Sequence, residues 1–536
     1  MRTRILAISI VLALGGCEVG SQGTEAPVAI EAEVMVSGGS IRGLVGEDGL
    51  KQFHAIPFAA PPVGDLRWAP PVPLVAWKGV RDATSPGPAC MQPQGRGGLF
   101  YSQEGFAMDE DCLLLNVWTR AVHESEGLPV MVWVHGGALV TGSGNQYPGE
   151  LLTSKGVVLV TINYRLGRFG FHAHSDLSVE NSNGVSGNQG LRDQILALEW
   201  VRDNIERFGG DRDNVTIFGE SAGSLSMSLL QASPMANGLF HRVIGQSGGA
   251  FQPMWFRDKT TSYASSGEAL GASFVEALAG ISGTTSLAAL RQLPQEHVLE
   301  VFQSQPEFSN YDSLAIVDGE VIPDEVATIF AHGRQADVPV MIGSNANEAT
   351  TFSLGDGATG FQAYANATLG EVAEEVQAHY PVEDAEESWI DLFSDVYFAY
   401  PMRVWAREME NVKSDAYLYW FTWAPPVENS EKYRAFHAAE IGYVFGNLDL
   451  FGAQPTQDDR DFSGFMATVW TQFAKTGSPN GLGLPEWPAY SSDTEAYIEL
   501  GKNTGKNAEL RVGRMDLIRR AWDERRRLSA VAGASE

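Results

Sequence analysis

Residues 215–224 (VTIFGESAGS) join an apolar, β-branched run to a helix-like segment through a short turn that contains glycine. The apolar run stops at Gly219, Ser221 stands between small residues, and the helix-like segment begins at Ala222. A sharp strand-to-helix turn of this kind, a nucleophile elbow, exposes the serine hydroxyl, and its glycines let strand and helix approach closely. The stretch therefore predicts a nucleophilic serine between a strand and a helix.

The same G-x-S-x-G pattern occurs again at residues 245–249, where Ser247 takes the place of the serine. Ser221 precedes a long helical segment, whose N-terminus offers backbone N–H groups and a favourable dipole to a developing anion. Ser247 precedes two glycines and, at position 253, a proline, which do not begin a helix cleanly. We predict that Ser221 is the nucleophile and that Ser247 is a hydrogen-bonding neighbour of the site.

Strand-like and helix-like segments alternate on both sides of this turn. Short apolar strands are predicted at 130–134, 157–162, 215–218, 338–342 and 416–420, and helices at 190–208, 222–232 and 511–528. Strands that alternate with helices favour a parallel or mixed sheet covered on both faces. We expect the α/β class, with a large central, mostly parallel mixed sheet flanked by helices in one domain from residue 32 to 530.

The charge balance excludes one class of partner. Against 37 Lys and Arg stand 66 Asp and Glu, a formal net charge of −29. Nucleic acid requires a basic protein surface, so we expect no such partner. The acidic surface is expected to serve solubility through self-repulsion, with attraction of cationic substrates as the alternative. The arginine-rich segment 511–528 is expected to be a solvated helix that forms ion pairs with the body of the protein.

The first 16 residues have the features of an export signal. Arg2 and Arg4 precede an apolar run at 5–14 that is too short to span a bilayer, and Leu-Gly-Gly leads into Cys17. The segment resembles a bacterial lipoprotein signal, which implies cleavage after residue 16 and lipidation of Cys17; a plain secretory peptide is the alternative. Residues 17–31 are expected to form a flexible tether. We therefore expect an exported protein that only its lipid anchors to a bacterial cell-envelope membrane, on the periplasmic side or at the cell surface.

Ser221 requires a base and an acid that orients the base, because a serine at its usual pKa is a poor nucleophile. In hydrolases built on this turn, the acid and then the histidine follow the serine along the chain. His437 lies in a small-residue turn and is preferred to His379, which lies in a Glu-rich helical stretch typical of solvated histidines. Glu348 follows a predicted strand, at the edge where ligand sites of open α/β sheets collect. On this reasoning Asp318 remains an alternative acid.

The segment His135-Gly136-Gly137-Ala138 follows another predicted strand and carries few side chains that would cover its backbone N–H groups. We expect Gly136 and Gly137, with Ala222, to donate three hydrogen bonds to a tetrahedral intermediate, each typically worth about a hundred- to a thousandfold in rate. His135 is expected to hold this loop. The chemistry requires no cofactor and no metal, and the two histidines at 172 and 174 lack an evident third ligand.

Together with further stretches, these motifs resemble the type-B carboxylesterases, the family that includes cholinesterases and bacterial para-nitrobenzyl esterases. The matching stretches lie at 53–58, 61–64, 110–113, 187–190, 219–224 and 470–480. The resemblance implies an α/β-hydrolase fold, Glu348 as the acid, and a disulfide between Cys90 and Cys112, the pair left when Cys17 is lipidated. It also implies two structural ion pairs, Arg67 with Glu110 and Arg165 with Asp193.

The implied activity is hydrolysis of a small-molecule carboxylic ester through an acyl-enzyme on Ser221, with His437 as the general base. An amidase or carbamate hydrolase with the same triad and a non-catalytic binding protein are the alternatives, and the sequence predicts no oligomeric state. Glu220 is expected to favour a cation, to tune His437 or to form hydrogen bonds inside the elbow.

Two departures from the family concern specificity. Leu139 replaces the usual aromatic residue of the oxyanion loop, and we expect it to reshape the acyl side. The loop between the two cysteines carries Phe100, Tyr101 and Phe106 but no tryptophan, which argues against cholinesterase-like recognition of a quaternary ammonium.

Overall fold

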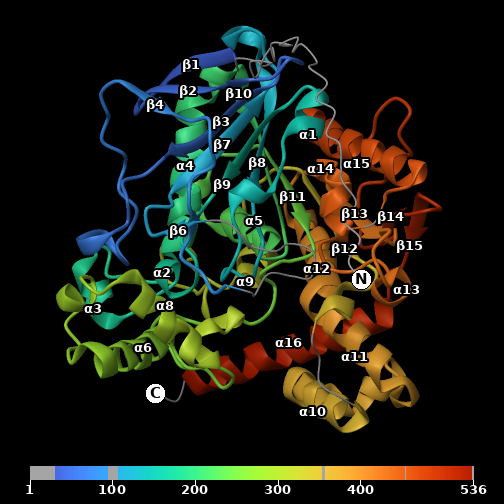
Figure 1. Cartoon of the computed structure of the whole chain (residues 1–536). Helices are drawn as coiled ribbons and strands as arrows, with labels where there is room; N and C mark the ends of the chain where they lie inside the picture. The colour runs from blue at the N-terminus through green and yellow to red at the C-terminus, as the bar shows by residue number, and fades with distance from the viewer. Residues whose placement is uncertain (1–29, 95–106, 353–356, 453, 534–536) are drawn as a thin grey trace, which may run out of the picture.

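The computed structural model describes residues 30–94, 107–352, 357–452 and 454–533 (Figure 1). The predicted signal, Cys17 and almost all of the predicted tether lie outside these residues, as do Phe100, Tyr101 and Phe106. The lipoprotein form of the chain therefore stays a prediction. Over the described ranges, no helix is both long enough and apolar enough to cross a membrane.

Thirteen strands of the described residues form one large sheet in the order β1-β2-β3-β7-β9-β8-β10-β11-β12-β13-β14-β15, with β4 beside β2. Its centre is parallel and consists of β9 (Val158–Ile162), β8 (Leu128–Val134), β10 (Gly210–Glu220), β11 (Arg242–Gln246), β12 (Val340–Asn345), β13 (Ala416–Phe421) and β14 (Ala496–Leu500). The antiparallel pairs lie toward the edges and involve β1 (Ile30–Val36), β2 (Gly39–Val45), β3 (Lys51–Pro57), β7 (Leu114–Thr119) and β15 (Gly505–Ala508). The prediction of a mostly parallel mixed sheet is confirmed.

Both faces of the sheet are covered by helices. In β8, Val130 and Val132 pack into one hydrophobic core, whereas Met131 and Trp133 pack into another. The first core includes side chains of α4 (Gln189–Asn204), α5 (Ala222–Ala232) and α12 (Tyr400–Glu408), and the second those of α14 (Ala439–Phe445) and α15 (Gln457–Thr476). Strands buried on both faces are continuous apolar runs without alternation, which explains why the central strands were visible in the sequence.

A further group of helices lies beyond the carboxyl ends of the central strands, below the sheet in Figure 1. It comprises α6 (Gly267–Ser282), α8 (Gln295–Ser304), α10 (Gly357–Leu369), α11 (Ala385–Ser394) and α16 (Val512–Gly533). The shorter elements are β4 (Val80–Asp82), β5 (Ala89–Cys90), β6 (Met108–Asp109), α1 (Glu150–Ser154), α2 (Gly167–Gly170), α3 (Ser175–Glu180), α7 (Leu287–Leu290), α9 (Val326–Ala331) and α13 (Ser430–Tyr433).

The predicted elements differ from the observed ones mainly at their ends. The helix expected at 190–208 consists of α4 followed by a 3₁₀ turn at Ile205–Phe208, and the strand expected at 215–218 is part of the longer β10. The arginine-rich helix α16 forms the expected ion pairs, because its Arg514 binds Asp391 and Asp395, as does Arg511 just before the helix. One face of α16 is nevertheless buried in the core, so it is only partly solvated.

Candidate active site

Ser221 lies between β10 and α5 in a strained turn. Its backbone has φ 55° and ψ −121°, a left-handed φ that is uncommon for a residue with a side chain. A Cβ added to Gly219 would lie 2.7 Å from the carbonyl carbon of Gly223 in α5, and one added to Gly223 only 2.1 Å from the carbonyl oxygen of Val134 in β8. The predicted close approach of strand and helix is confirmed, since neither position has room for a larger residue.

Ser247 occupies the corresponding position after the neighbouring strand. In the register of β10 and β11, Glu220 lies beside Gln246, so the two serines follow adjacent strand ends. Ser247 also has a positive φ, 56°, and both serines line the same cavity. The buried Oγ of Ser247 makes no hydrogen bond to any described residue. Ser247 is thus a neighbour of the site, but without a partner for its hydroxyl within the described part of the chain.

Glu348 and His437 come together from distant parts of the chain. Glu348 follows β12 and is fully buried, with its Oε2 atom 2.7 Å from Nδ1 of His437 and its Oε1 atom accepting a hydrogen bond from the backbone N–H of Asn345. The backbone N–H of His437 donates to the carbonyl oxygen of Glu348 as well, at 3.2 Å. Glu348 is therefore held rigidly against one nitrogen of the imidazole.

The rival candidates have other surroundings. Asp318 accepts hydrogen bonds from the backbone N–H groups of Glu320 and Ile322 and so stabilises a turn. His379 is half-buried at the C-terminal end of the 3₁₀ segment Gly370–Ala378. The structure thus places Glu348, and not Asp318, beside His437.

The other imidazole nitrogen faces Glu220. Nε2 of His437 lies 3.1 Å from Oε1 of Glu220, and among the described residues no hydrogen bond joins it to Ser221. Active-site hydrogen bonds are often long or misaligned in the absence of substrate.

Three buried carboxyl groups surround this imidazole. Burial lowers the pKa of His437, but Glu220 and Glu348 outweigh that effect and raise it to about 9. Burial raises the pKa of Glu220 well above its usual range; His437 opposes this shift, whereas Glu440 and Glu348 add to it. Glu440 is fully buried and accepts hydrogen bonds from Gln246 and Asn345, and its pKa is raised by burial and by Glu348. The carboxyl groups therefore favour the protonated imidazole, whereas burial favours the neutral form of Glu220.

The segment after β8 brings free backbone donors to Ser221. A Cβ on Gly136 would lie 3.1 Å from the Cβ of Ser221, so this segment passes directly beside the serine. Within the described residues, no backbone or side-chain acceptor takes a hydrogen bond from the N–H groups of Gly136, Gly137 or Ala222. Three donors are therefore available to a negative charge that forms next to Ser221.

His135 holds this segment in place. Its ring is buried, stacks on Tyr164 with ring centres 4.5 Å apart, and has Nδ1 2.8 Å from the carbonyl oxygen of Gly136. The hydroxyl of Tyr164 donates to the carbonyl oxygen of His135. Burial lowers the pKa of His135 to about 4, so the ring is neutral at physiological pH. These contacts agree with a role in holding the loop.

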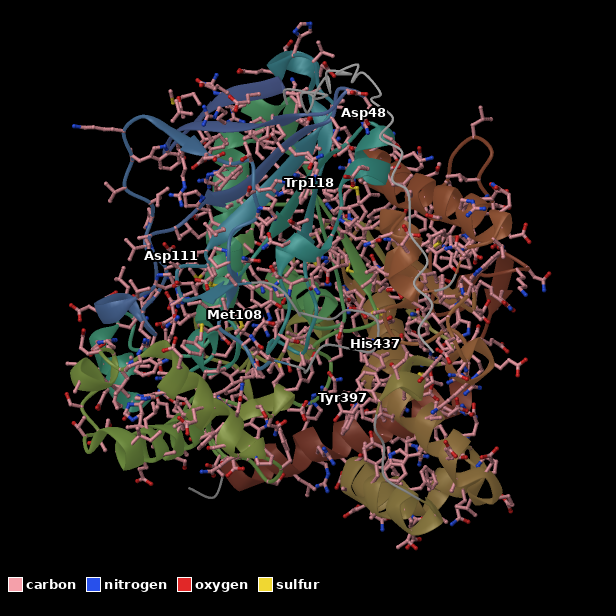
Figure 2. All side chains as sticks on the ribbon, in the orientation of Figure 1. Asp48, Met108, Asp111, Trp118, Tyr397 and His437 are labelled. Carbon is pink, nitrogen blue, oxygen red and sulfur yellow. A yellow bond between two sulfur atoms is a disulfide. The ribbon has the colours of Figure 1, made fainter. Side chains whose placement is uncertain are left out.

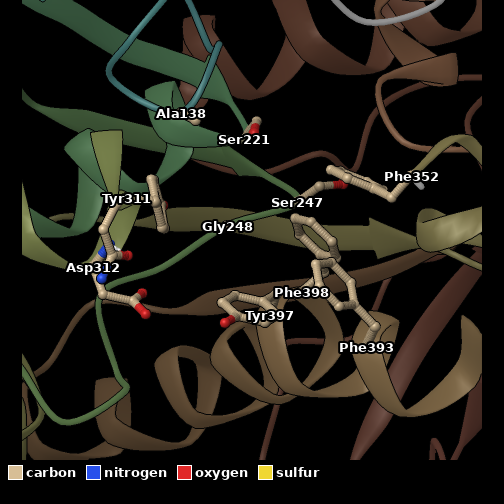
Figure 3. A pocket seen from close by; sticks show the side chains of 11 residues that line it. Ala138, Ser221, Ser247, Gly248, Tyr311, Asp312, Phe352, Phe393, Tyr397 and Phe398 are labelled. Carbon is tan, nitrogen blue, oxygen red and sulfur yellow. Dashed lines mark hydrogen bonds between the residues drawn. The ribbon is translucent and has the colours of Figure 1, made fainter. Parts of the chain in front are cut away.

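The serines open onto a cavity of about 220 Å³ (Figure 3). Its walls are mainly aromatic, and the rings of Phe398 and Phe352 also pack against His437 at centroid distances of 4.5 and 5.3 Å. Figure 2 shows His437 near the lower end of the sheet, above Tyr397. The described lining residues are Ala138, Ser221, Ser247, Gly248, Asn310, Tyr311, Asp312, Phe352, Phe393, Tyr397 and Phe398.

Sequence reasoning missed most of this cavity wall. Leu139, expected to shape the acyl side, is fully buried, and its neighbour Ala138 faces the cavity instead. Tyr397 and Phe398 belong to a π-helical turn, Asp395–Ala399, between α11 and α12. Such turns are frequent at functional sites, but no motif in the sequence marks this one.

The disulfide and the two ion pairs implied by the resemblance are present. Cys90 and Cys112 are bonded and buried, at a sequence separation of 22 residues. Arg67 binds Glu110, and Arg165 binds Asp193, with all four side chains buried. These contacts hold the segments before β7 and α4, away from Ser221.

The two histidines noted in the sequence pack with aromatic residues. His172 contacts Trp68 and Phe274, and its ring lies 6.0 Å from that of His174, whose Nδ1 accepts a hydrogen bond from the backbone N–H of Asp176. A search of the described residues finds no group of three or more His, Cys, Asp or Glu that could hold a metal ion.

Comparison with known proteins identifies relatives over most of the chain. The model of the Carboxylesterase family matches residues 30–518. The para-nitrobenzyl esterase of Bacillus subtilis (strain 168) is 36% identical over 86% of this chain and 93% of its own length. The fumonisin B1 esterase of Sphingopyxis macrogoltabida is 35% identical over 88% and 87%, and the liver carboxylesterase of Sus scrofa 35% identical over 86% and 87%. Among solved structures, a PNB esterase superposes with a TM-score of 0.79 at 32% identity, covering 91% of this chain and 99% of that chain.

Proposed function

This chain belongs to the carboxylesterase family and is a carboxylic ester hydrolase with the α/β-hydrolase fold, and we propose that it acts through an acyl-enzyme formed on Ser221. One observation carries the proposal. The buried pair of Glu348 and His437 lies beside the cavity that the strained Ser221 lines. This arrangement supports a nucleophile, a base and an orienting acid at the carboxyl ends of the parallel strands, where ligands of such sheets bind.

In the first half of the reaction, Oγ of Ser221 bonds to the ester carbonyl carbon while its proton passes to Nε2 of His437. The imidazole turns from Glu220 to Ser221 for this step, and Glu348 keeps the proton on Nδ1 and stabilises the imidazolium. The N–H groups of Gly136, Gly137 and Ala222 bind the oxyanion. The bond to the alcohol then breaks, and the alcohol takes the proton from Nε2.

In the second half, water attacks the acyl carbon and gives a proton to Nε2 of His437. The bond between the acyl carbon and Oγ of Ser221 breaks, the carboxylic acid leaves, and Nε2 returns its proton to Ser221. Glu220 adjusts the proton affinity of the base, because it competes with the serine for Nε2. Every proton lost in one half is recovered in the other, and the enzyme ends unchanged.

Amides and carbamates present a carbonyl group to the same three side chains, so they are the second candidates as substrates. The relatives named above are esterases, which favours esters. An aryl ester, an anilide and a carbamate with matched acyl groups would separate the three classes. We expect kcat/KM to be highest for the ester; a faster anilide or carbamate would reassign the substrate class.

The proposal is tested with an aryl ester and a serine-directed phosphonate. We expect turnover of the ester and a phosphonate label on Ser221, detected by peptide mass spectrometry. Replacing Ser221 with alanine should lower kcat by about 10⁴-fold or more, since the rest of the site retains only residual catalysis. An S221A variant that keeps its activity would remove Ser221 from the reaction.

We also propose that the chain is exported and lipidated at Cys17. The support is the sequence alone, in which two arginines, a short apolar run and Leu-Gly-Gly precede Cys17. A clickable fatty acid fed to expressing bacteria should label the wild-type protein in the membrane fraction. The Cys17→Ser variant should carry no label and leave that fraction. Label retained on C17S would contradict the assignment.

A further inference from the structure

Asp312 is the one charged side chain among the described residues that line the cavity of Ser221. In Figure 3 it lies with Tyr311 on one side of the cavity, and its carboxylate points inward. Phe352, Phe393 and Phe398 form the opposite side. The cavity therefore combines aromatic rings with a single acidic group.

The carboxylate of Asp312 has no partner in the described part of the chain. It forms no hydrogen bond and no ion pair there, whereas Glu348 and Glu440 each bind two groups. Its backbone is nevertheless fixed, because its N–H donates to Oδ1 of Asn310, which caps the 3₁₀ turn Tyr311–Ser313. A fixed carboxylate without a protein partner remains available to a ligand.

The protein around Asp312 disfavours the charged form of its carboxyl group. Although its side chain reaches solvent, the surrounding protein raises the pKa of Asp312 by desolvation, and Arg525 opposes this. Arg525 itself lies over the ring of Trp522 and donates to the carbonyl oxygen of Ala367. A cation inside the cavity would stabilise the charged form of Asp312 directly.

The aromatic wall supplies the second half of such a site. Burial and the nearby Asp312 raise the pKa of Tyr311 and of Tyr397, so both phenols stay neutral. The hydroxyl of Tyr397 points toward Asp312 across the cavity (Figure 3). The faces of aromatic rings attract cations, most strongly where water is excluded, and a carboxylate beside them adds a full negative charge.

We propose that Asp312 is a specificity residue that makes this esterase prefer esters carrying an ammonium group, which binds between Asp312 and the rings of Tyr311 and Tyr397. The proposal rests on the assignment of Ser221 as nucleophile, because the ammonium site and the serine share one cavity. It concerns side chains on the 3₁₀ turn Tyr311–Ser313 and the π-helical turn, and not the loop between the two cysteines.

The experiment uses one pair of p-nitrophenyl esters, which differ in the acyl chain, and one pair of alkyl acetates, which differ in the alcohol. In each pair, the acyl chain or the alcohol ends either in a trimethylammonium group or in the uncharged tert-butyl group of the same shape. We expect the wild-type kcat/KM of the charged member to exceed that of the neutral member by about tenfold in at least one pair. In Asp312→Asn the ratio of the two kcat/KM values should fall to about one, whatever the absolute rate of the variant.

Glu307→Gln is the matched control. Glu307 is exposed on the preceding 3₁₀ turn, Pro306–Ser309, and is not among the residues that line the cavity. Its replacement by glutamine removes one negative charge, as Asp312→Asn does. The wild-type ratio should survive in E307Q. Three outcomes would overturn the proposal: a wild-type ratio near one in both pairs, a ratio unchanged in D312N, or an equal loss of the ratio in both variants. The third outcome would assign the preference to the overall negative charge of the protein.

A binding measurement separates this inference from the proposed reaction. Calorimetry measures the binding of phenyltrimethylammonium to the Ser221→Ala variant, in which no turnover interferes. The affinity should be about tenfold lower for the double variant that also carries Asp312→Asn. If neither neutral nor charged esters are hydrolysed but this difference appears, the proposed reaction fails and the ammonium site stands. Equal affinities would overturn the site, whatever the esters show.

Discussion

At the scale of single residues, His437 lies between two carboxyl groups that affect it in different ways. Glu348 holds Nδ1 at 2.7 Å and is anchored by a backbone N–H of its own turn. Glu220 approaches Nε2 at 3.1 Å, on the side from which the imidazole must accept the proton of Ser221. Both carboxyl groups raise the pKa of the ring, and Glu348 also holds its orientation.

Replacing Glu220 with glutamine should shift the pH profile. His437 must be neutral to act as a base, and its pKa, raised to about 9 partly by Glu220, keeps it charged at lower pH. Without that carboxylate the pKa of His437 falls, so the acidic limb of kcat/KM moves to lower pH, by roughly one unit.

The measurement is kcat/KM for a neutral ester between pH 5 and 10, compared with Glu307→Gln as a control for loss of one exposed charge. A limb that stays in place in E220Q would mean that Glu220 carries no charge in the free enzyme. A limb that moves to higher pH would contradict the sign of the effect.

At the scale of elements, the turn between β8 and the next segment has a shape that glycine alone permits. Gly137 has φ +100°, and a Cβ there would lie 2.2 Å from the carbonyl oxygen of Thr141. The N–H groups of Val140 and Thr141 both donate to the carbonyl oxygen of Gly137. The turn is thus closed on itself, and a side chain at this position would open it.

Gly137→Ala should therefore lower kcat by about a hundredfold or more, since at least one oxyanion donor moves away. The control is Gly238→Ala, which has a positive φ of +78° but no atom within 4 Å of the added Cβ. That variant should lose about 1 kcal/mol of stability and keep its kcat. Equal kcat values in the two variants would exclude the loop from stabilising the transition state.

The disulfide between Cys90 and Cys112 closes a loop of the chain before β7. Between Cys90 and Cys112, the described residues include only the two-residue strand β6. The unfolded chain gains freedom when a loop of this length is opened, so Cys90→Ser with Cys112→Ser should lower the free energy of unfolding by about 3 kcal/mol. Urea unfolding of the double variant checks this. A loss of less than about 1 kcal/mol in the free energy of unfolding would show that non-covalent contacts hold the segment without the disulfide.

At the scale of the whole molecule, the last helix connects parts of the chain that are distant in sequence. In Figure 1, α16 runs along the bottom of the molecule past α11. Arg511 binds Asp395, which is fully buried at the start of the π-helical turn that carries Tyr397. Asp395 also accepts a hydrogen bond from the hydroxyl of Tyr380. Arg511, just before α16, and Arg514 within it thus support the turn that carries Tyr397.

Removing Arg511 should destabilise the protein, because Asp395 would keep a buried charge with less compensation. Arg511→Ala should lower the free energy of unfolding by about 3 kcal/mol, and adding Asp395→Asn should restore part of that loss. Thermal unfolding of the two variants measures both changes. If the second substitution adds to the loss instead, Asp395 is stabilised mainly by Tyr380 and the neighbouring Arg514.

The sequence by itself determined the features that depend on local physics. The central strands are apolar because both faces of the sheet are covered, and the elbow around Ser221 and the loop at Gly136 and Gly137 need glycine wherever they occur. The class of fold, the sheet and the turns could therefore be predicted from short stretches. The family resemblance was needed to choose Glu348.

Only the tertiary structure decided which side chains meet. His437 and Glu348 are 89 positions apart, and the order of β11, β12 and β13 in the sheet brings them together. The cavity wall comes from the turns at Asp312 and Tyr397. The position of the turn at Tyr397 depends on how α11, α12 and α16 pack around it, and no local pattern encodes that packing. The sequence thus predicts a serine esterase, whereas the surface that receives the substrate arises from contacts between segments that are distant in the sequence.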